Sequence, residues 1–491
     1  MPEPGYGTFE DERRLTEEQI QVIQQWVADG SPEGEPSDAP TRPLWVDGWQ
    51  LGKPDLVVGM PQPYELGPEG PDVYRNFVVP TSLTRRRFVR AVEFRPGNPS
   101  VVHHAFIKVD RTGESRRLEE LDPEPGFSFM ETPVGAQIPE GHFLGWSPGR
   151  IASMEREDLA WPLHPGTDLV LQIHLRRSGK PESLQSEVGL YFTDRLPTQI
   201  PFKLFLTSRA IDLAPGTRDF EIKDSLRLPV DVDLLAVLPH AHYLGKEILA
   251  LAVLPDGTTN RLLFITNWNF NWQSDYRYAK PVFLPKGTVI STQFTYDNSA
   301  DNIRNPNQPP KRVTYGPQAT DEMMELWLQI LPRRREDLPA LVDQFQSRML
   351  PILQGQYELA LRLNPDNAAA HKGLGAVLLG AGEFGEATAH LGRAIELKPD
   401  LEEAHFYLGF ILRKQKKLSD AAQAYRQVLL LNPTNHEACG NLGLVFLEQG
   451  KLAEAEAQFQ NALRIFPSDA IARQNLELVR RAKVWNVKGK E

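Results

Sequence analysis

The chain of 491 residues has a formal net charge of −10, with 41% hydrophobic and 24% charged residues. Its length exceeds what one hydrophobic core serves and predicts about three domains, while its acidic balance and lack of a long basic run argue against nucleic-acid binding. No apolar stretch reaches about 18 residues, so no membrane span is predicted, and the single cysteine, Cys439, excludes an internal disulfide, a cysteine-based zinc site and a CxxCH haem attachment.

Residues 1–44 predict one amphipathic helix followed by a linker. The segment LTEEQIQVIQQWVADG has helical periodicity, with Thr16 as its N-cap and its end near Gly30. The next run, SPEGEPSDAPTRP, has the composition of a linker. The first residues contain no basic segment followed by an apolar run, so no signal peptide is expected in this chain.

Residues 45–182 and 183–335 predict two antiparallel β-sandwiches. Short runs rich in β-branched and aromatic residues, such as RFVRAVEF and GTVISTQFTY, alternate with proline- and glycine-rich turns. An internal echo supports two modules of one plan, since PGTDLVLQIHL (165–175) aligns without gaps with KGTVISTQFTY (286–296). In this alignment, Thr295 of the second module occupies the position that His174 has in the first.

Residues 348–484 predict an α-helical solenoid of tetratricopeptide repeats. Prolines recur with a period of 34 residues, at Pro365, Pro399, Pro433 and Pro467. Each period has a glycine in its first helix (Gly375, Gly409, Gly443) and an alanine in its second (Ala387, Ala421, Ala455), and a leucine or aromatic residue follows that alanine by four positions (Leu391, Tyr425, Phe459). Small residues at such a spacing are expected where the two helices cross. A groove that binds a protein partner is the expected role, and a stabilising cap for the neighbouring domain is the alternative.

Histidines in the strand-like runs are candidate metal ligands. His240 and His242 are two residues apart, so a strand would present both on one face, where they could bind one ion or serve as buried structural histidines. His103 and His104 are adjacent, and both can reach one ion only at a bulge, a strong twist or a strand end. His174 lies in an apolar alternating run, where a hydrogen-bonded core histidine is the ordinary interpretation.

Met323 and Met324, in ATDEMMELWLQI, are ordinarily expected to pack in a core. A thioether becomes a useful ligand when the ion is soft, as Cu(I) is.

Five motifs in order, DVYRNFVVP, SVVHHAF, LVLQIHL, LPHAHYLGKEI and TDEMM, resemble the copper type II, ascorbate-dependent monooxygenases. This family includes peptidylglycine alpha-hydroxylating and dopamine beta-monooxygenases, and the resemblance covers roughly residues 45–333. It implies two jelly-roll-like sandwiches with one copper ion each. The implied ligands are His103, His104 and His174 for the first, electron-supplying ion, and His240, His242 and Met323 for the second ion, where dioxygen is activated. Gln172 matches a glutamine near the electron-transfer path, and Tyr74 an aromatic residue of the first motif.

The resemblance implies hydroxylation of a C–H bond in a small organic substrate, with O2 and two single electrons from an external reductant, ascorbate or a cytochrome. An imidazole-only site suits both copper oxidation states, and an added thioether favours Cu(I). Three departures concern the substrate. Leu238 stands where the peptide-amidating enzyme has an arginine that grips the peptide carboxylate, and Glu325 and Trp327 stand where it has asparagine and tyrosine contacts. Peptide amidation is therefore not expected. Asn76 replaces a cysteine of the family motif, so the disulfides of the animal enzymes cannot form here.

The segment GTFEDERRLTEEQIQVIQQWVADGSPEG resembles the last helix of c-type cytochrome domains that precede this unit in some bacterial proteins. A chain that is a fragment of a longer protein is the preferred interpretation, and a decayed haem module is the other. Because relatives of this kind are exported, a periplasmic or exported location is expected.

Two other functions fit parts of the sequence. A cupin-type site would bind one ion through His240, His242 and Glu247, although leucine occupies positions 234 and 254, where a cupin has its framing glycines. A non-catalytic scaffold would keep the repeats and have lost its metals.

Overall fold

The computed structural model describes residues 2–10, 12, 14–38, 48–128, 136–316, 318–466 and 469–488. Two compact units make up the chain, one β-rich and built mainly from residues up to Leu341, the other helical and built mainly from Val342 onward. The short segment Asp110–Leu118 belongs to the helical unit. No helix within the described ranges has the length and hydropathy needed to cross a membrane.

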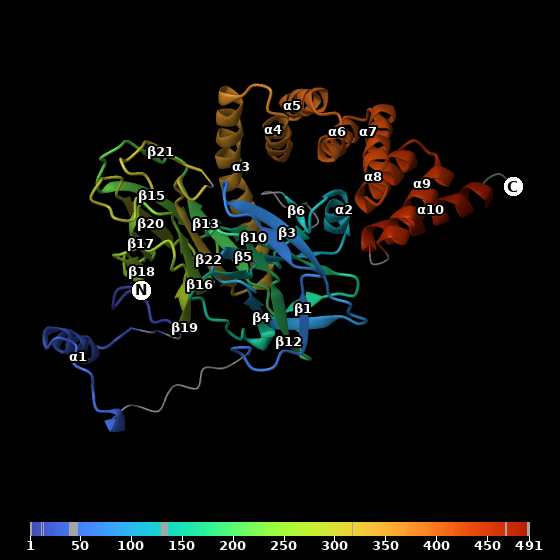
Figure 1. The fold of residues 1–491 in the computed structure, drawn as a ribbon. Helices are drawn as coiled ribbons and strands as arrows, with labels where there is room; N and C mark the ends of the chain where they lie inside the picture. Colours follow the sequence, from blue (N-terminus) through green and yellow to red (C-terminus); the bar gives the residue numbers. More distant parts are fainter. Residues whose placement is uncertain are drawn as a thin grey trace. The chain divides into compact units, whose positions relative to one another are not determined.

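The predicted N-terminal helix is confirmed as α1 (Glu17–Ala28) (Figure 1). The Thr16 side chain accepts a hydrogen bond from the Gln19 amide at 3.2 Å, and the Gln19 side chain accepts one from the Thr16 amide at 2.9 Å. This reciprocal pair is a capping box, which fixes the start of the helix. None of the residues of α1 is buried. The end of the predicted linker, residues 39–44, lies outside the described residues.

The residues before α1 pack on the β-rich unit, which the sequence did not predict. Phe9 forms a β-bridge with Tyr278 and is 8% exposed. Its ring centroid lies 4.9 Å from that of Tyr278 and 5.5 Å from that of Tyr276.

The first sandwich consists of two antiparallel sheets with a shared core. One sheet has the order β1 (Leu56–Gly59), β12 (Glu187–Thr193), β4 (Arg87–Arg95), β9 (Trp161–Leu163). The other has the order β6 (Phe127–Ser128), β3 (Val73–Pro80), β10 (Asp168–Leu175), β5 (Val102–Asp110), β7 (Ala136–Gln137), and β8 (Gly145–Trp146) also pairs with β5. Side chains of both sheets, among them Val89, Leu190, Phe77 and Leu171, form one buried cluster.

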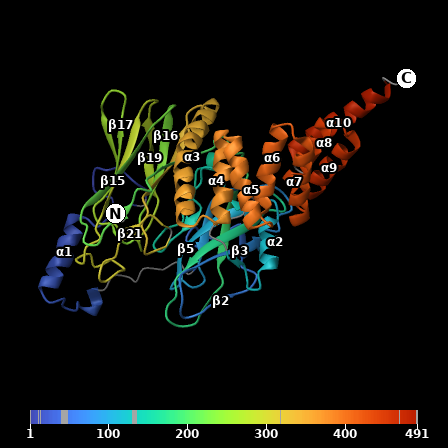
Figure 2. The ribbon, with the colours of Figure 1, turned by 90° about the horizontal axis from the view of Figure 1, so that it is seen from above.

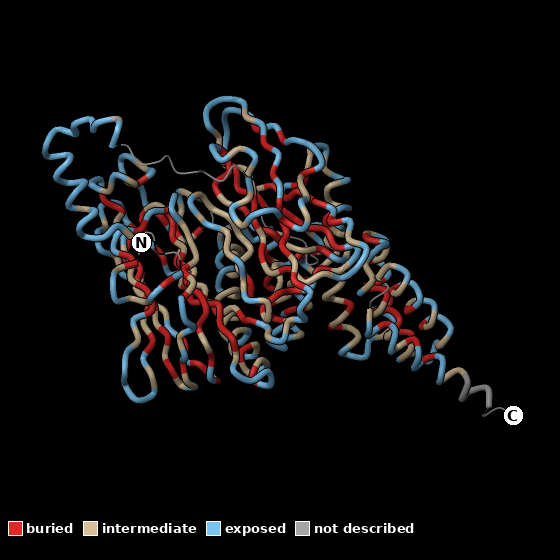
Figure 3. The backbone as a smooth tube through the Cα atoms, turned by 90° about the horizontal axis from the view of Figure 1, so that it is seen from below, coloured by how far each residue is buried: buried red, intermediate tan, exposed pale blue. Residues whose placement is uncertain are grey.

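The second sandwich has two four-stranded antiparallel sheets. Their orders are β13 (Phe202–Thr207), β22 (Glu325–Pro332), β16 (Val232–His240), β19 (Tyr276–Leu284), and β15 (Phe220–Arg227), β20 (Val289–Tyr296), β17 (Gly245–Val253), β18 (Thr259–Ile265) (Figure 1). Two ribbons complete the strands of the β-rich unit, β2 (Tyr64–Leu66) with β11 (Glu182–Leu184), and β14 (Asp212–Leu213) with β21 (Val313–Thr314). In both sandwiches the buried positions follow the strands (Figure 3).

The two sandwiches share one strand order. The order β1-β12-β4-β9 corresponds to β13-β22-β16-β19, and β3-β10-β5 corresponds to β15-β20-β17. The echoed segments form β10 and β20, each the middle strand of its trio, and each follows a glycine with positive φ, Gly166 (+74°) and Gly287 (+88°). The common plan inferred from the echo is therefore visible in the topology.

Strand pairing places the boundary between the two sandwiches later in the chain than the sequence predicted. The sequence placed it after residue 182, but β12 pairs with both β1 and β4. The first sandwich thus continues to Thr193, because its central strand comes last in the chain.

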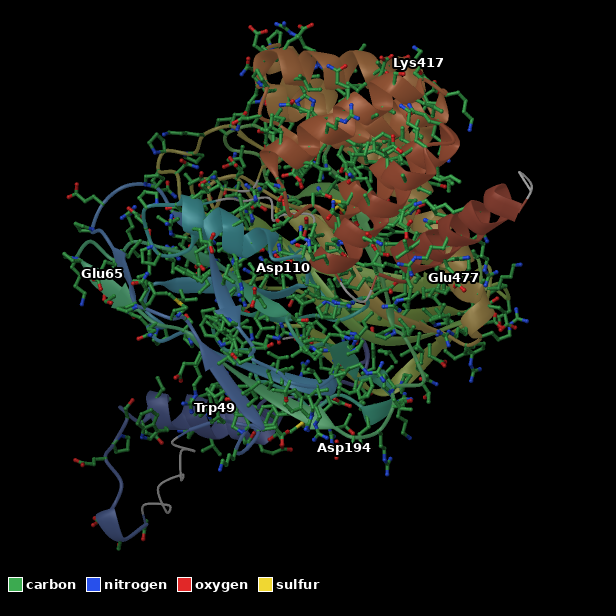
Figure 4. All side chains as sticks on the ribbon, turned by 90° about the vertical axis from the view of Figure 1, so that its right-hand side faces the viewer. Trp49, Glu65, Asp110, Asp194, Lys417 and Glu477 are labelled. Atoms are coloured by element: carbon green, nitrogen blue, oxygen red, sulfur yellow. The ribbon has the colours of Figure 1, made fainter. Side chains whose placement is uncertain are left out.

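The helical unit contains antiparallel helix pairs that follow one another along the chain (Figure 2). They are α3 (Leu338–Leu363), α4 (Ala368–Ala381), α5 (Phe384–Leu397), α6 (Glu402–Lys414), α7 (Leu418–Leu431), α8 (His436–Glu448), α9 (Leu452–Ile465) and α10 (Ala470–Lys488). Lys417 immediately precedes α7, and Glu477 lies on α10 (Figure 4). Asp110, labelled in the same figure, accepts backbone hydrogen bonds from Thr112 and Ser115 at the start of α2 (Glu114–Leu121).

The glycines of the repeat lie where the paired helices cross, as predicted, and each contacts a large side chain of the second helix. A Cβ atom on Gly375 would lie 2.6 Å from Leu391, and one on Gly443 would lie 2.8 Å from Phe459. Larger side chains at these crossings would push the helices apart. Pro467, the last of the periodic prolines, lies outside the described residues.

Candidate metal centre

The first candidate ligand set lies at one end of the sheet that contains β10. Because β10 runs between β3 and β5, His174 is beside both neighbouring strands. His103 and His104 are the second and third residues of β5. They therefore lie at a strand end, which is one of the places where two adjacent side chains can reach the same ion. One ligand nitrogen from each of the three histidines lies within 4.8 Å of the others, and no other group of three His, Cys, Asp or Glu side chains within the described ranges meets this condition.

The nitrogen atoms of this cluster fit a shared metal ion. The Nδ1 atoms of His103 and His104 are 3.1 Å apart, and two nitrogens bound to one ion at about 2.0–2.1 Å would lie at a similar separation. His174 has Nε2 at 2.8 Å from Asp72 Oδ2, whereas its Nδ1 is buried without a hydrogen-bond partner in the described structure. An N–H donated to a carboxylate leaves the other ring nitrogen as an acceptor, which is the tautomer that a metal ion needs.

Burial keeps two histidines of the first cluster in the neutral form. It lowers the pKa of His103 to about 3, and it lowers the pKa of His104 well below its ordinary value. The hydrogen bond with His174 lowers the pKa of Asp72. At neutral pH His103 and His104 therefore present uncharged imidazoles, which can bind a metal ion without first losing a proton.

Tyr74 and Gln172 lie next to this cluster. Tyr74 is opposite His174 in the β3–β10 register, and its ring stacks on that imidazole with centroids 4.2 Å apart. Burial raises the pKa of Tyr74 to about 12, so its phenol is neutral. Gln172 Oε1 accepts a hydrogen bond from Lys108 Nζ at 3.1 Å.

The second ligand set comes from the end of β16 and the segment before β22. His240 is the last residue of β16, and His242 lies in the turn that follows. Because only His240 lies on the strand, the rule that residues two positions apart share a face of a strand does not apply to His240 and His242. The ring centroids of the two histidines are nevertheless 5.1 Å apart. Pairing of β16 with β22 brings His240 opposite Glu325, two residues after Met323.

Hydrogen bonds orient both of these histidines in the same way. His240 Nδ1 lies 2.6 Å from Gln273 Oε1, and His242 Nδ1 lies 3.0 Å from the carbonyl oxygen of Asp321. Both oxygens are acceptors, so each Nδ1 donates and each Nε2 keeps its lone pair. Burial lowers the pKa of His242 to about 3.

The structure separates the two adjacent methionines. Met324 is fully buried, whereas Met323 lines the cavity that the histidines also line. The Tyr296 hydroxyl donates to the Met323 carbonyl at 2.7 Å. Met323 is therefore the residue with access to an ion at His240 and His242.

Glu322 fixes the geometry of the second set, a role that the sequence analysis did not predict. Its carboxylate accepts hydrogen bonds from the backbone amides of His242 (2.9 Å), Leu244 (2.6 Å) and Met323 (3.2 Å). The side chain is fully buried, and burial raises its pKa to about 8 although these bonds act in the opposite direction. One carboxylate thus connects the histidine turn to the methionine segment.

Both ligand sets line one cavity of about 410 Å³. Its wall includes His104 and His174 of the first set and His240, His242 and Met323 of the second set. Phe270 lies between the sets, with its ring centroid 4.5 Å from that of His103 and 5.1 Å from that of His242. Any ions held by the two sets would therefore face a single space.

The cupin-type set does not assemble. Glu247 lies on β17, in the sheet β15-β20-β17-β18, whereas His240 ends β16 in the other sheet of the sandwich. Among the residues that the structure describes, Glu247 forms no ligand group with the two histidines.

Several residues around the ligands were missed at the sequence level. Asp72 begins the DVYRNFVVP motif and stands two positions before Tyr74, so the two side chains share a face of an extended chain. An acidic residue at this position could have indicated a hydrogen-bond partner for a ligand histidine. Gln273 and Phe270 lie in a loop far in sequence from the histidines they contact, and no periodic pattern marks them. Glu322 directly precedes Met323 in the TDEMM motif, but its contact with the turn at His242 is also far in sequence.

Comparison with known proteins bears on the helical unit. Residues 354–402, 375–436 and 408–470 match the tetratricopeptide repeat family. A solved structure, the crystal structure of MamA, is similar over 26% of this chain and 74% of its own, with 24% sequence identity and a TM-score of 0.25. No curated protein matches the chain. The predicted repeats are confirmed, and they are modules that support binding of a protein partner.

Proposed function

We propose that the β-rich unit is a monooxygenase that uses two copper ions to hydroxylate a C–H bond of a small organic substrate. The observation that carries the proposal is the assembly of two ligand sets, one of three imidazoles and one of two imidazoles with a thioether, around one cavity. The jelly-roll-like character of the sandwiches, the external reductant (ascorbate or a cytochrome) and a periplasmic or exported location belong to the same proposal.

The donor atoms fit copper better than harder ions. Imidazole suits several transition metals, but a thioether selects a soft ion such as Cu(I). When bound, the ions would supply single-electron chemistry, in which two electrons and two protons reduce one atom of O2 to water while the other atom enters the C–H bond.

The protein's own groups would hold and orient the ligands. Asp72 accepts the Nε2 proton of His174, and Gln273 accepts the Nδ1 proton of His240, so neither ring can turn without losing a hydrogen bond. Phe270 occupies the space between the sets and keeps it apolar. An apolar wall limits the access of water to the reacting centre.

The two methionines supply the test. Met323→Ile removes the thioether from the cavity, whereas Met324→Ile changes a core residue of the same type and serves as the matched control. We expect Met323→Ile to weaken Cu(I) binding at one of two sites and Met324→Ile to leave both affinities unchanged, as measured by competition with a Cu(I) chelator. Equal losses at both sites, or no bound copper in the unsubstituted protein, would contradict the proposal.

The helical unit adds a second role. Its repeats are of a kind that binds protein partners, and we propose that they bring the monooxygenase to such a partner. A pull-down with the full chain should lose that partner when the repeats are removed and keep it when Met323 is replaced. Retention of the partner without the repeats would place the interaction elsewhere.

A further inference from the structure

A buried histidine outside the two ligand sets lines the same cavity. His142 is 2% exposed and lies in the turn between β7 and β8. Its backbone amide donates to the Pro139 carbonyl at 3.1 Å, and Gly141 beside it has a φ of +75°. A Cβ atom on Gly141 would clash with the carbonyl oxygen of Pro201, so the chain just before β13 packs closely on this turn and fixes its position.

A buried carboxylate and a guanidinium group orient the ring of His142. Its Nδ1 lies 2.8 Å from Glu155 Oε2, and Glu155 Oε1 accepts a hydrogen bond from Arg277 Nη2 at 3.1 Å. Burial acts to raise the pKa of Glu155, but the neighbouring His142 and Arg277 outweigh burial and lower that pKa. Glu155 is therefore a carboxylate at neutral pH, and its charge attracts the ring proton of His142 to Nδ1.

Charge balance leaves the other ring nitrogen of His142 as an acceptor. Arg277 already compensates the negative charge of Glu155, so a second proton on His142 would give this buried group a net positive charge. The neutral ring with its proton on Nδ1 keeps a lone pair on Nε2.

The lone pair of His142 Nε2 faces the cavity. Glu155 and Arg277 line a different and smaller pocket, so the Nδ1 edge of the ring points away from the cavity that His142 lines. Within the described ranges no side chain or backbone group forms a hydrogen bond with Nε2. A buried acceptor without a partner is energetically costly, and the cavity is the space from which a ligand can supply one.

The turn of His142 lies away from the second ligand set. The carbonyl oxygen of Gly141 accepts a hydrogen bond from Gln329 Nε2 at 2.9 Å. Gln329 follows Glu325 by four residues on β22, which is about 13 Å of strand. Glu325 is the residue opposite His240. The acceptor and the candidate ligands are therefore at different ends of the cavity.

Apolar surface separates these two ends. Leu238 and Trp327 are opposite one another on β16 and β22, and both line the cavity. They lie midway along these strands between the levels of His240 and Gln329. A ligand that reaches both ends passes over these walls, and their removal from water favours a ligand with an apolar body.

We propose that His142 is a substrate-binding residue, whose Nε2 accepts a hydrogen bond from an uncharged hydroxyl group at one end of an apolar substrate. A carboxylate would set a second acceptor against the Nε2 lone pair, and an ammonium group would find the charge of Glu155 already compensated. The hydroxyl subsite stands on the geometry of His142, whereas the identity of the reacting end rests on the proposed monooxygenase function.

The test compares hexanol with its isomer methyl pentyl ether, since only the alcohol can donate a hydrogen bond. Binding to the full chain is followed by NMR of protein labelled with ¹⁵N in its histidines. We expect hexanol to bind about fivefold more tightly, which is what one net hydrogen bond of ordinary strength supplies. We also expect hexanol to shift the Nε2 resonance of His142, which is assigned as the resonance lost in His142→Phe.

Three variants locate the effect. His142→Phe removes the acceptor, keeps a planar ring and should make the two isomers bind equally. His436→Phe is the matched control, because His436 of the helical unit also lies beside a carboxylate, with Nδ1 at 3.4 Å from Asp469 Oδ2, and it should keep the preference for hexanol. Glu155→Gln removes the charge that holds the proton on Nδ1, so the Nε2 resonance should move toward that of a protonated nitrogen and the preference should fall.

Thermal melting establishes that each variant is folded before its affinities are compared. Equal binding of the two isomers to the unsubstituted protein, no binding of either, or an unchanged preference in folded His142→Phe would overturn the inference. The comparison on the unsubstituted protein decides the matter even if His142→Phe does not fold. Copper binding separates the two proposals, since two bound ions without a preference for the alcohol remove only the inference. A preference for the alcohol without bound copper removes only the monooxygenase.

Discussion

The two sandwiches have the same strand order, yet they take their candidate ligands from different strands. In the first, the histidines lie on β5 and β10. In the second, His240 ends β16, His242 follows it, and Met323 lies just before β22. Strands β16 and β22 correspond to β4 and β12 of the first sandwich. Thr295, the counterpart of His174, lies on β20, in the sheet that does not carry the second set. A repeated plan therefore repeats the scaffold without repeating the site.

The groups that orient the ligands also differ between the sandwiches. The first set has a charged acceptor, Asp72, whereas the second has the amide of Gln273 and a backbone carbonyl. A carboxylate increases the basicity of the imidazole it binds and favours a more highly charged ion. We expect the first site to accommodate both copper oxidation states and the second site, with Met323, to favour Cu(I).

Loss of one ligand of the first site should have the largest effect on the number of bound copper ions. We expect His174→Ala to reduce bound copper from about two ions per chain to about one, because two imidazoles hold an ion far less tightly than three. Elemental analysis after dialysis measures this. The control is His371→Ala, which removes a histidine of the helical unit whose Nδ1 lies 2.9 Å from that of His390. Loss of both ions in His174→Ala would show that the two sites are not independent.

Removal of the carboxylate of Glu322 should affect the second site alone. Glu322→Ala leaves three buried backbone amides without an acceptor, which should lower the free energy of unfolding by about 3 kcal/mol. It should also release the second copper ion. The matched change is Glu93→Ala in the first sandwich, because Glu93 is also buried and accepts bonds from the amides of Gln50 and Leu51. Denaturant unfolding should show similar losses for the two variants, with copper released only by the first. Release of copper by Glu93→Ala would refute this assignment.

The orienting groups should have smaller and unequal effects. We expect Asp72→Asn to weaken copper binding at the first site by about 10–100-fold, the usual cost of losing a partner behind a ligand. Gln273→Leu should weaken the second site by less, since a neutral acceptor is lost. Chelator competition measures both affinities. A larger effect from Gln273→Leu would reverse the proposed electrostatic difference.

Features governed by local sequence were predicted well. The N-cap of α1 was predicted at Thr16, which in the structure bonds with Gln19 three residues later, and the helix pairs were predicted from small residues that recur with the repeat. Hydrogen bonds and packing over such short distances leave a periodic trace in the sequence. The strand-like runs and their antiparallel arrangement were accessible for the same reason.

Features governed by long-range contacts were not predicted. The boundary between the sandwiches moved to Thr193 because β12 pairs with strands that lie about a hundred residues earlier. Glu322 reaches the turn at His242 across 80 positions of sequence, and nothing near it marks the contact.

The sequence by itself identified the candidate metal ligands, the tetratricopeptide repeats and the common plan of the two sandwiches, because each of these appears as a residue type at a fixed spacing. Only the tertiary structure decided that Met323 rather than Met324 lines the cavity, that Asp72 and Gln273 fix the imidazole tautomers, and that His142 lines the same cavity beside Glu155. These are properties of side chains that meet across strands and between sandwiches, where burial and charge depend on the whole fold and no local pattern carries them.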